Sequence, residues 1–175
     1  ISCMLNAMIG NNLEYTEIKE VKVTCFAQAY DILFDLTKYR PESRETVDHS
    51  LPYCLAAAMV DKKITTESFS DEKLNDPRIF EVIDKIKGVP SQEFEKMFPA
   101  KQPSKVVVTT NDGREFSEYL EYPKGDPREP MSMDDLENKF NSLAGDKFDT
   151  KAKTQIKENI FNCENMSSGE FMNSL

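Results

Sequence analysis

A hairpin signal in the second half of the chain constrains the fold most strongly. Residues 105–110 form a β-branched run, and Asn111-Asp112-Gly113 follows it directly. An Asp-Gly pair tolerates the positive φ angles of a type I′ turn, which reverses the chain between two antiparallel strands. Residues 116–122 supply the apolar and aromatic side chains of the returning strand. The sequence therefore predicts an antiparallel pair, which excludes an all-helical fold.

A strand followed by a helix is predicted near the start of the chain. Residues 17–25 alternate like a half-buried strand, with Ile18 standing apart from the face that the later apolar residues share. That face consists of Val21, Val23 and Cys25. Across residues 26–36 the period changes to that of a helix. The helical stripe consists of Phe26, Tyr30, Leu33 and Phe34.

A polar stretch separates this helix from the next one. Residues 38–48 contain Pro41 and have no apolar period, so we predict a loop, and long loops inside a compact domain are often functional. Asp48 or Ser50 can cap the helix that follows. Ser50 is the better cap, because Pro52 then falls in the first turn, where its missing N–H costs nothing.

The remaining periodic segments are helical apart from the hairpin. A short turn begins at Thr65 or Thr66, and a helix starting at Asp76-Pro77 carries Ile79, Val82, Ile83 and Ile86. Ser132 is predicted to cap a helix whose buried stripe is Leu136, Phe140, Leu143 and Ala144, and a last helix begins after Thr150. This order is typical of an α+β fold, and no glycine-rich phosphate loop occurs in it.

Composition excludes several classes of partner. The chain has 175 residues, Lys+Arg 22 against Asp+Glu 31 and a formal net charge of -9. Nucleic acids and anionic membranes need clustered basic residues, so neither partner is expected. No segment approaches the ~20 apolar residues of a membrane span. The four cysteines, at Cys3, Cys25, Cys54 and Cys163, lack the spacing of a zinc or iron-sulfur site. We expect buried thiols in a cytoplasmic protein and no metal site.

The single histidine, His49, is the most informative position for chemistry. It lies directly before a predicted helix N-terminus, where free N–H groups and a partial positive charge suit a carboxylate. Tyr53 falls one helical turn further on. Lys38, Arg40 and Arg44 precede His49, although neighbouring acidic residues balance their charge. A capping or packing role for His49 is the more common alternative.

The run from Lys38 to Tyr53 reads KYRPESRETVDHSLPY. It closely resembles the segment K-x-x-P-x-[ST]-R-E-T-A-D-H-S-L-P-Y of the MmgE/PrpD family. An alanine-rich helix, Ile64-Thr65-Thr66-Glu67-Ser68-Phe69, Asn75-Asp76-Pro77-Arg78 and Lys124-Gly125-Asp126-Pro127-Arg128 are also similar to that family, in the same order. The resemblance spans about residues 13–145.

The resemblance implies a cofactor-independent enzyme, usually a homodimer, with its site between a large helical domain and a smaller α+β lid. Residues 1–12 would then end a helical-domain segment, residues 13–125 would form the lid, and residues 126–175 would be helices that pack on the helical domain. That domain and a Lys-x-Tyr-Pro phrase are expected to precede Ile1, which we do not expect to be the biological start because the chain opens without Met.

The resemblance further implies a hydro-lyase that dehydrates 2-methylcitrate or a related tricarboxylate. A cis-aconitate-type decarboxylase or an epimerase of the same family is the alternative, although the phrase 46–53 is more similar to the dehydratase branch. The family's active-site tyrosine corresponds to Tyr53, and His49 is the candidate acid or base, since histidine side chains titrate near neutral pH. Ser50, Arg44 and Arg128 are candidate substrate-binding residues. As an isolated chain, the protein could instead be a noncatalytic lid or dimerisation module.

Overall fold

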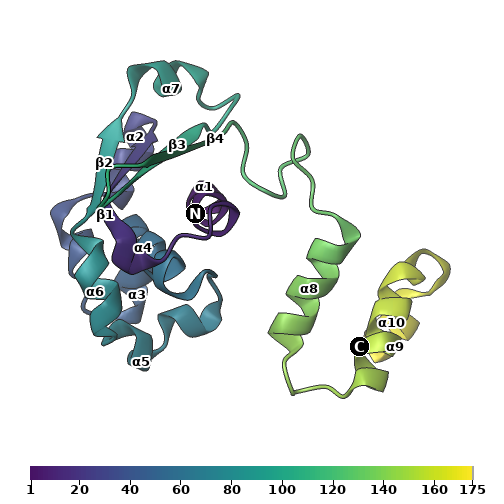
Figure 1. Cartoon of the computed structure of the whole chain (residues 1–175). Coiled ribbons are helices and arrows are strands. Elements are labelled where there is room, and N and C mark those ends of the chain that lie inside the picture. The colour runs from purple at the N-terminus through teal and green to yellow at the C-terminus, as the bar shows by residue number, and fades with distance from the viewer. Residues whose placement is uncertain (175) are drawn as a thin grey trace. The chain divides into compact units, whose positions relative to one another are not determined.

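The computed structural model describes residues 1–174 and confirms an α+β fold with one four-stranded sheet in the described part of the chain (Figure 1). The chain divides into two compact units, Ile1–Glu129 and Pro130–Leu175. The first unit contains the sheet together with the candidate site residues. The assignment of residues 1–12, 13–125 and 126–175 to a helical domain and a lid stays a prediction.

The sheet has the strand order β2-β1-β3-β4. Its strands are β1 (Ile18–Cys25), β2 (Ile86–Pro90), β3 (Ser104–Thr110) and β4 (Glu115–Leu120). The predicted hairpin is confirmed, because β3 and β4 pair in antiparallel register. The predicted type I′ turn is wrong, because only Gly113 has a positive φ, of +87°, and Asp112 does not. β1 pairs antiparallel with β3 and parallel with β2, so the sheet is mostly antiparallel as expected.

A register shift explains why Ile18 departs from the alternation of its strand. The pairing of β1 with β3 shifts between Ile18 and Glu20, and Ile18 is fully buried, as are Val21 and Val23. An extra residue in one strand makes the side chains that precede it point to the opposite face from the one that the alternation predicts. The irregularity therefore lets both ends of β1 point apolar side chains into the same core.

Helices of the first unit pack against one another and against the sheet. They are α1 (Ser2–Gly10), α2 (Ala27–Leu33), α3 (Arg44–Asp48), α4 (Leu51–Asp61), α5 (Asp71–Leu74), α6 (Pro77–Ile83) and α7 (Gln92–Met97), with 3-10 turns η1 (Tyr15–Glu17), η2 (Leu36–Tyr39) and η3 (Thr66–Phe69). The middle of α4 is completely buried, including its three alanines. It contacts α1, α6 and β2, while α1 also contacts β3 and β4. In Figure 1, α1 and α4 lie on the same side of the sheet.

Two predictions for this unit are wrong. Residues 38–48 are not a simple loop, because they contain the end of η2 and the short helix α3. A five-residue helix spans little more than one turn and so shows no apolar period. Ile86 does not extend the helix that begins at Pro77: it starts β2 and is buried against β1. The spacing from Ile83 to Ile86 fits a helical stripe equally well, which concealed the strand.

The second unit contains α8 (Met133–Ala144), α9 (Thr150–Phe161), η4 (Cys163–Asn165) and α10 (Ser168–Asn173). The predicted Ser132 cap is confirmed, since Ser132 and Asp135 form a reciprocal capping box. α9 begins one residue earlier than predicted, because Asp149 caps it. The predicted burial of the apolar stripe is wrong for Leu136 and Leu143, which are 46% and 56% exposed. A helical period shows which side of a helix is apolar, but not whether another element covers it.

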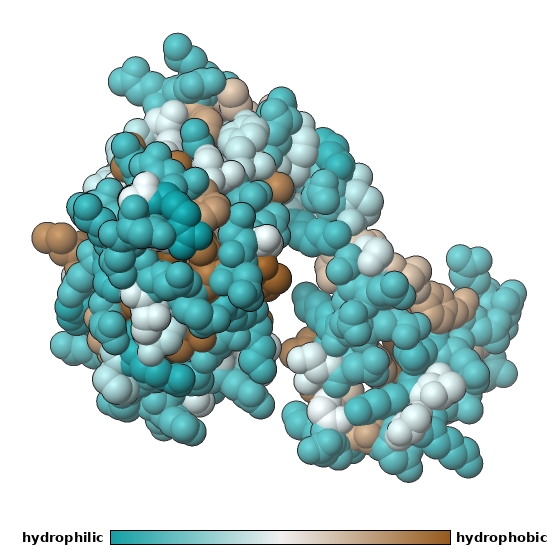
Figure 2. All heavy atoms as spheres, viewed as in Figure 1, coloured by the Kyte–Doolittle hydropathy of each residue, from teal (hydrophilic) through white to brown (hydrophobic). Residues whose placement is uncertain are grey.

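The surface agrees with the composition. The face drawn in Figure 2 is mostly hydrophilic, with hydrophobic residues in small areas between hydrophilic ones. Within residues 1–174, no helix is long and apolar enough to span a bilayer.

Candidate functional site

The candidate site lies on the segment that joins η2 to α4, residues 38–50, which we call the junction segment. Ser43 begins α3 within it: the Ser43 hydroxyl accepts a hydrogen bond from the Thr46 N–H, and the Thr46 hydroxyl accepts one from the Ser43 N–H. This capping box was missed in the sequence because Thr46 replaces the usual Glu or Gln. It gives the junction segment a fixed secondary structure.

Inward-pointing side chains anchor the junction segment to the core. Val47 is fully buried and Pro41 is buried, while the Tyr39 hydroxyl donates a hydrogen bond to the Ile86 carbonyl at 2.9 Å. Ser50 is also fully buried, and its hydroxyl donates to the Lys38 carbonyl at 2.5 Å. These contacts hold the segment at both ends and in the middle.

His49 and Arg44 are exposed residues of the junction segment. His49 is exposed at the C-cap of α3, and its Nδ1 lies 3.4 Å from the Glu45 carbonyl oxygen. Arg44 is exposed in the first turn of α3, and its guanidinium forms no ion pair within the described residues. Five residues apart on one fixed segment, this imidazole and this guanidinium are open to a ligand from outside the unit.

Tyr53 lies beneath the surface. Its side chain is fully buried in α4, and its hydroxyl donates to the Ser68 carbonyl at 2.9 Å, which joins α4 to η3. Burial raises the pKa of the Tyr53 hydroxyl to about 12. Tyr53 therefore stays protonated at neutral pH, with its one proton directed at a backbone carbonyl.

Arg128 is already engaged within the first unit. Its guanidinium forms two hydrogen bonds with the Asp126 carboxylate, at 2.8 and 2.9 Å, and another with the Ala100 carbonyl. It also lies 4.0 Å from the centre of the Tyr122 ring. Ala100 follows α7, which Figure 1 shows at the opposite end of the unit from α3. The structure thus places His49, Ser50 and Tyr53 on adjoining turns and does not bring Arg128 to them.

The family-like phrase Asn75-Asp76-Pro77-Arg78 stabilises the start of α6. Asp76 caps α6 by accepting from the Arg78 N–H, and its carboxylate also binds the Arg78 guanidinium at 2.6 Å. Lys73 bridges Asp76 and Asp61, at 3.5 and 2.7 Å. Ion pairing therefore accounts for the Asp and Arg of this phrase.

An open groove of about 740 Å³ lies between the junction segment and helices α5 and α6. Its lining is Arg40, Pro41, Glu42, Asp71, Leu74, Asn75, Pro77 and Phe80. The Arg40 guanidinium pairs with Asp84 at 2.6 Å, and within residues 1–174 the Glu42 and Asp71 carboxylates at the groove form no ion pair. Two carboxylates repel a polycarboxylate, so this groove does not suit a tricarboxylate.

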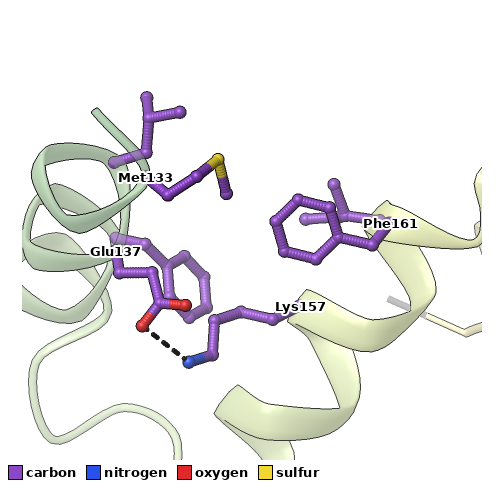
Figure 3. A pocket seen from close by; sticks show the side chains of 7 residues that line it. Met133, Glu137, Lys157 and Phe161 are labelled. Atoms are coloured by element: carbon purple, nitrogen blue, oxygen red, sulfur yellow. Dashed lines mark hydrogen bonds and ion pairs between the residues drawn. The ribbon is translucent and has the colours of Figure 1, made fainter. Parts of the chain in front are cut away.

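The second unit contains an apolar hollow of about 210 Å³ between α8 and α9. Figure 3 shows Met133 and Phe161 facing each other across it, with Glu137 and Lys157 joined by an ion pair at its edge. Because that ion pair supplies the hollow's only charged groups, it offers no free cation to a carboxylate. In residues 1–174, no group of three or more His, Cys, Asp or Glu side chains is arranged to hold a metal ion.

Comparison with known proteins decides the family. The MmgE/PrpD C-terminal domain matches residues 1–163. The chain belongs to the MmgE/PrpD family. It is 31% identical over 104 residues to a cis-aconitate decarboxylase of Mus musculus, which covers 59% of this chain and 21% of that protein. It is 24% identical over 159 residues to a cis-aconitate decarboxylase of Aspergillus terreus, covering 90% of this chain and 32% of that protein.

A human cis-aconitate decarboxylase is similarly related, 30% identical over 110 residues, or 59% of this chain and 21% of that protein. The chain thus spans between about a fifth and a third of the length of these curated relatives. These family members are enzymes, and the matched domain is the C-terminal one.

Proposed function

We propose that this chain is the C-terminal part of a cofactor-independent lyase that decarboxylates cis-aconitate or a closely related tricarboxylate. Membership of the family, together with relatives named as cis-aconitate decarboxylases, supports the class of reaction. The observation that carries the site is the exposure of both Arg44 and His49 on the anchored junction segment.

The chemistry suits these two side chains. When a carboxylate leaves as CO₂, the carbon–carbon bond breaks and its electron pair shifts through the neighbouring double bond. That pair must be protonated at the far carbon by a general acid. In this proposal His49 supplies the proton and Arg44 holds one of the remaining carboxylates through a charge-assisted pair. The other carboxylates need further cations or N–H donors.

Dehydration of 2-methylcitrate is the second candidate. The phrase 46–53 favours it, because that phrase is more similar to the dehydratase branch of the family. Loss of water needs a base for the proton beside a carboxylate and an acid for the departing hydroxyl. The same exposed His49 can serve in one of those roles. The substrate that is turned over therefore separates the two candidates.

The test uses the full-length enzyme with each substrate. We expect CO₂ release from cis-aconitate. If dehydration is the reaction, the enzyme will instead form the unsaturated product of 2-methylcitrate, which is detected by its ultraviolet absorbance. His49→Gln is expected to lower kcat by about 10²-fold or more, in the range of a lost acid–base group. Glu45→Gln, an exposed change on the same helix, is the matched control and should leave turnover within about 2-fold. Full activity of His49→Gln would contradict the proposed role.

A further inference from the structure

We propose that Ser50 is a positioning residue that fastens both ends of the junction segment and thereby fixes His49. This inference rests on the proposed function, because it assigns a task to the residue next to the candidate acid. In this proposal Ser50 does not bind substrate, the role for which it was a candidate from the sequence. Four hydrogen bonds formed by its three polar groups support this role.

Every polar group of Ser50 is satisfied inside the fold. Its backbone N–H donates to the Val47 carbonyl at 2.9 Å, and its carbonyl accepts from the Cys54 N–H at 3.0 Å. Its hydroxyl accepts from the Tyr53 N–H at 3.1 Å and donates its only proton to the Lys38 carbonyl at 2.5 Å. The residue is 0% exposed. A buried hydroxyl whose single proton is in use has none left to give a substrate.

The bond from Ser50 to Lys38 closes the junction segment into a loop. Lys38 is the last residue but one of η2, and Ser50 is the N-cap of α4, twelve residues later. One hydroxyl thus joins the beginning of the segment to the helix at its end. The backbone of Ser50 is bonded covalently to that of His49, so any shift of this cap moves the imidazole directly.

Arg44 is less dependent on this fastening. The capping box of Ser43 and Thr46 fixes the start of α3, and the buried Val47 holds its middle. Loss of the Ser50 hydroxyl is therefore expected to displace His49 more than Arg44. Because a displacement of about 1 Å at a reacting group can cost about 10²-fold in rate, the effect should appear in kcat more than in KM.

The experiment measures kcat and KM of the full-length enzyme, as CO₂ release from cis-aconitate or loss of water from 2-methylcitrate, whichever it turns over. Ser50→Ala removes both hydroxyl bonds and is expected to lower kcat by about 10- to 100-fold with KM changed by less than about 3-fold. Ser50→Thr keeps a hydroxyl donor and acceptor and should recover most of kcat. Ser132→Ala removes an equivalent N-cap from α8 and should leave kcat unchanged.

Further variants keep the outcome decisive. If Ser50→Ala does not fold, Ser50→Gly replaces it, because glycine is tolerated at an N-cap yet lacks the donor to Lys38, and the same loss of kcat is expected. Wild-type kcat in Ser50→Ala or Ser50→Gly, with His49→Gln inactive, would overturn the inference and leave the proposed function intact. An active His49→Gln would instead overturn the proposed role of His49, and this inference with it.

Discussion

At the scale of one residue, Asp76 of the phrase Asn75-Asp76-Pro77-Arg78 contributes to the stability of the fold. Its side chain is only 10% exposed, and it accepts hydrogen bonds from both the backbone and the guanidinium of Arg78. The Arg78 side-chain hydrogen bond, followed by that from the Arg78 N–H, lowers the pKa of the Asp76 carboxyl to about 2. The charged form is therefore favoured in the folded protein.

The lowered pKa of Asp76 predicts a loss of stability in acid. A carboxyl whose folded pKa lies below its unfolded value stabilises the fold above the unfolded pKa, and that contribution disappears as pH falls from about 4 to about 2. Asp76→Asn keeps a capping side chain but removes the charge, so it should lower the free energy of unfolding by about 1 kcal/mol at pH 7. Urea unfolding at pH 7 and pH 2.5 checks this.

The difference between wild type and Asp76→Asn should shrink towards zero at the lower pH. Asp71→Asn is the control, because Asp71 is exposed and forms no ion pair within residues 1–174. A difference that does not depend on pH would show that Asp76 acts as a cap and not through its charge.

Tyr53 can be tested for both structure and catalysis. Tyr53→Phe leaves the Ser68 carbonyl without its donor and should lower the free energy of unfolding by about 1 kcal/mol. In the full-length enzyme, turnover should also fall if the tyrosine has the role that the family resemblance implies. Unchanged turnover together with lowered stability would assign Tyr53 to the connection between α4 and η3 alone.

At the scale of elements, close packing between β2 and Phe34, the C-cap residue of α2, depends on Gly88. A Cβ at Gly88 would lie 2.5 Å from Cγ of the Phe34 ring, and Phe34 is only 4% exposed. The ring atom nearest the backbone cannot move aside easily. Gly88→Ala should therefore lower the free energy of unfolding by about 1–3 kcal/mol, as overpacking usually does.

Gly10→Ala is the matched control for that substitution. Gly10 ends α1 and a Cβ there would meet no atom within 4 Å. Alanine favours helix over glycine, so this variant should be as stable as wild type or slightly more stable. Thermal unfolding of both variants gives the comparison. Equal stability of Gly88→Ala and Gly10→Ala would contradict the packing argument.

At the scale of the whole molecule, the 175-residue chain alone is expected to show no turnover of cis-aconitate or 2-methylcitrate. It contains one histidine, and of the candidate carboxylate-binding arginines Arg128 is already paired with Asp126. The full-length enzyme, assayed in parallel at the same concentration, is the control. Turnover by the isolated chain would refute a noncatalytic module and place the complete site in these residues.

The sequence determined the elements whose signals are local. The Asp112-Gly113 turn fixes the hairpin, the Ser50 and Ser132 caps fix two helix starts, and the phrase at residues 38–53 indicates the family. Each of these depends on residues within about one turn or one motif of one another. Their interpretation needed no knowledge of the rest of the fold.

Only the tertiary structure decided which of those residues are accessible. It buried Ser50 and Tyr53, left His49 and Arg44 exposed, and paired Arg128 with Asp126. It also placed Ile86 in strand β2 and not in the preceding helix, because pairing with β1 outweighs the helical spacing of Ile83 and Ile86. Long-range hydrogen bonds join residues far apart in sequence, such as Lys38 with Ser50 and Tyr39 with Ile86. Neither these bonds nor burial can be predicted from local sequence patterns.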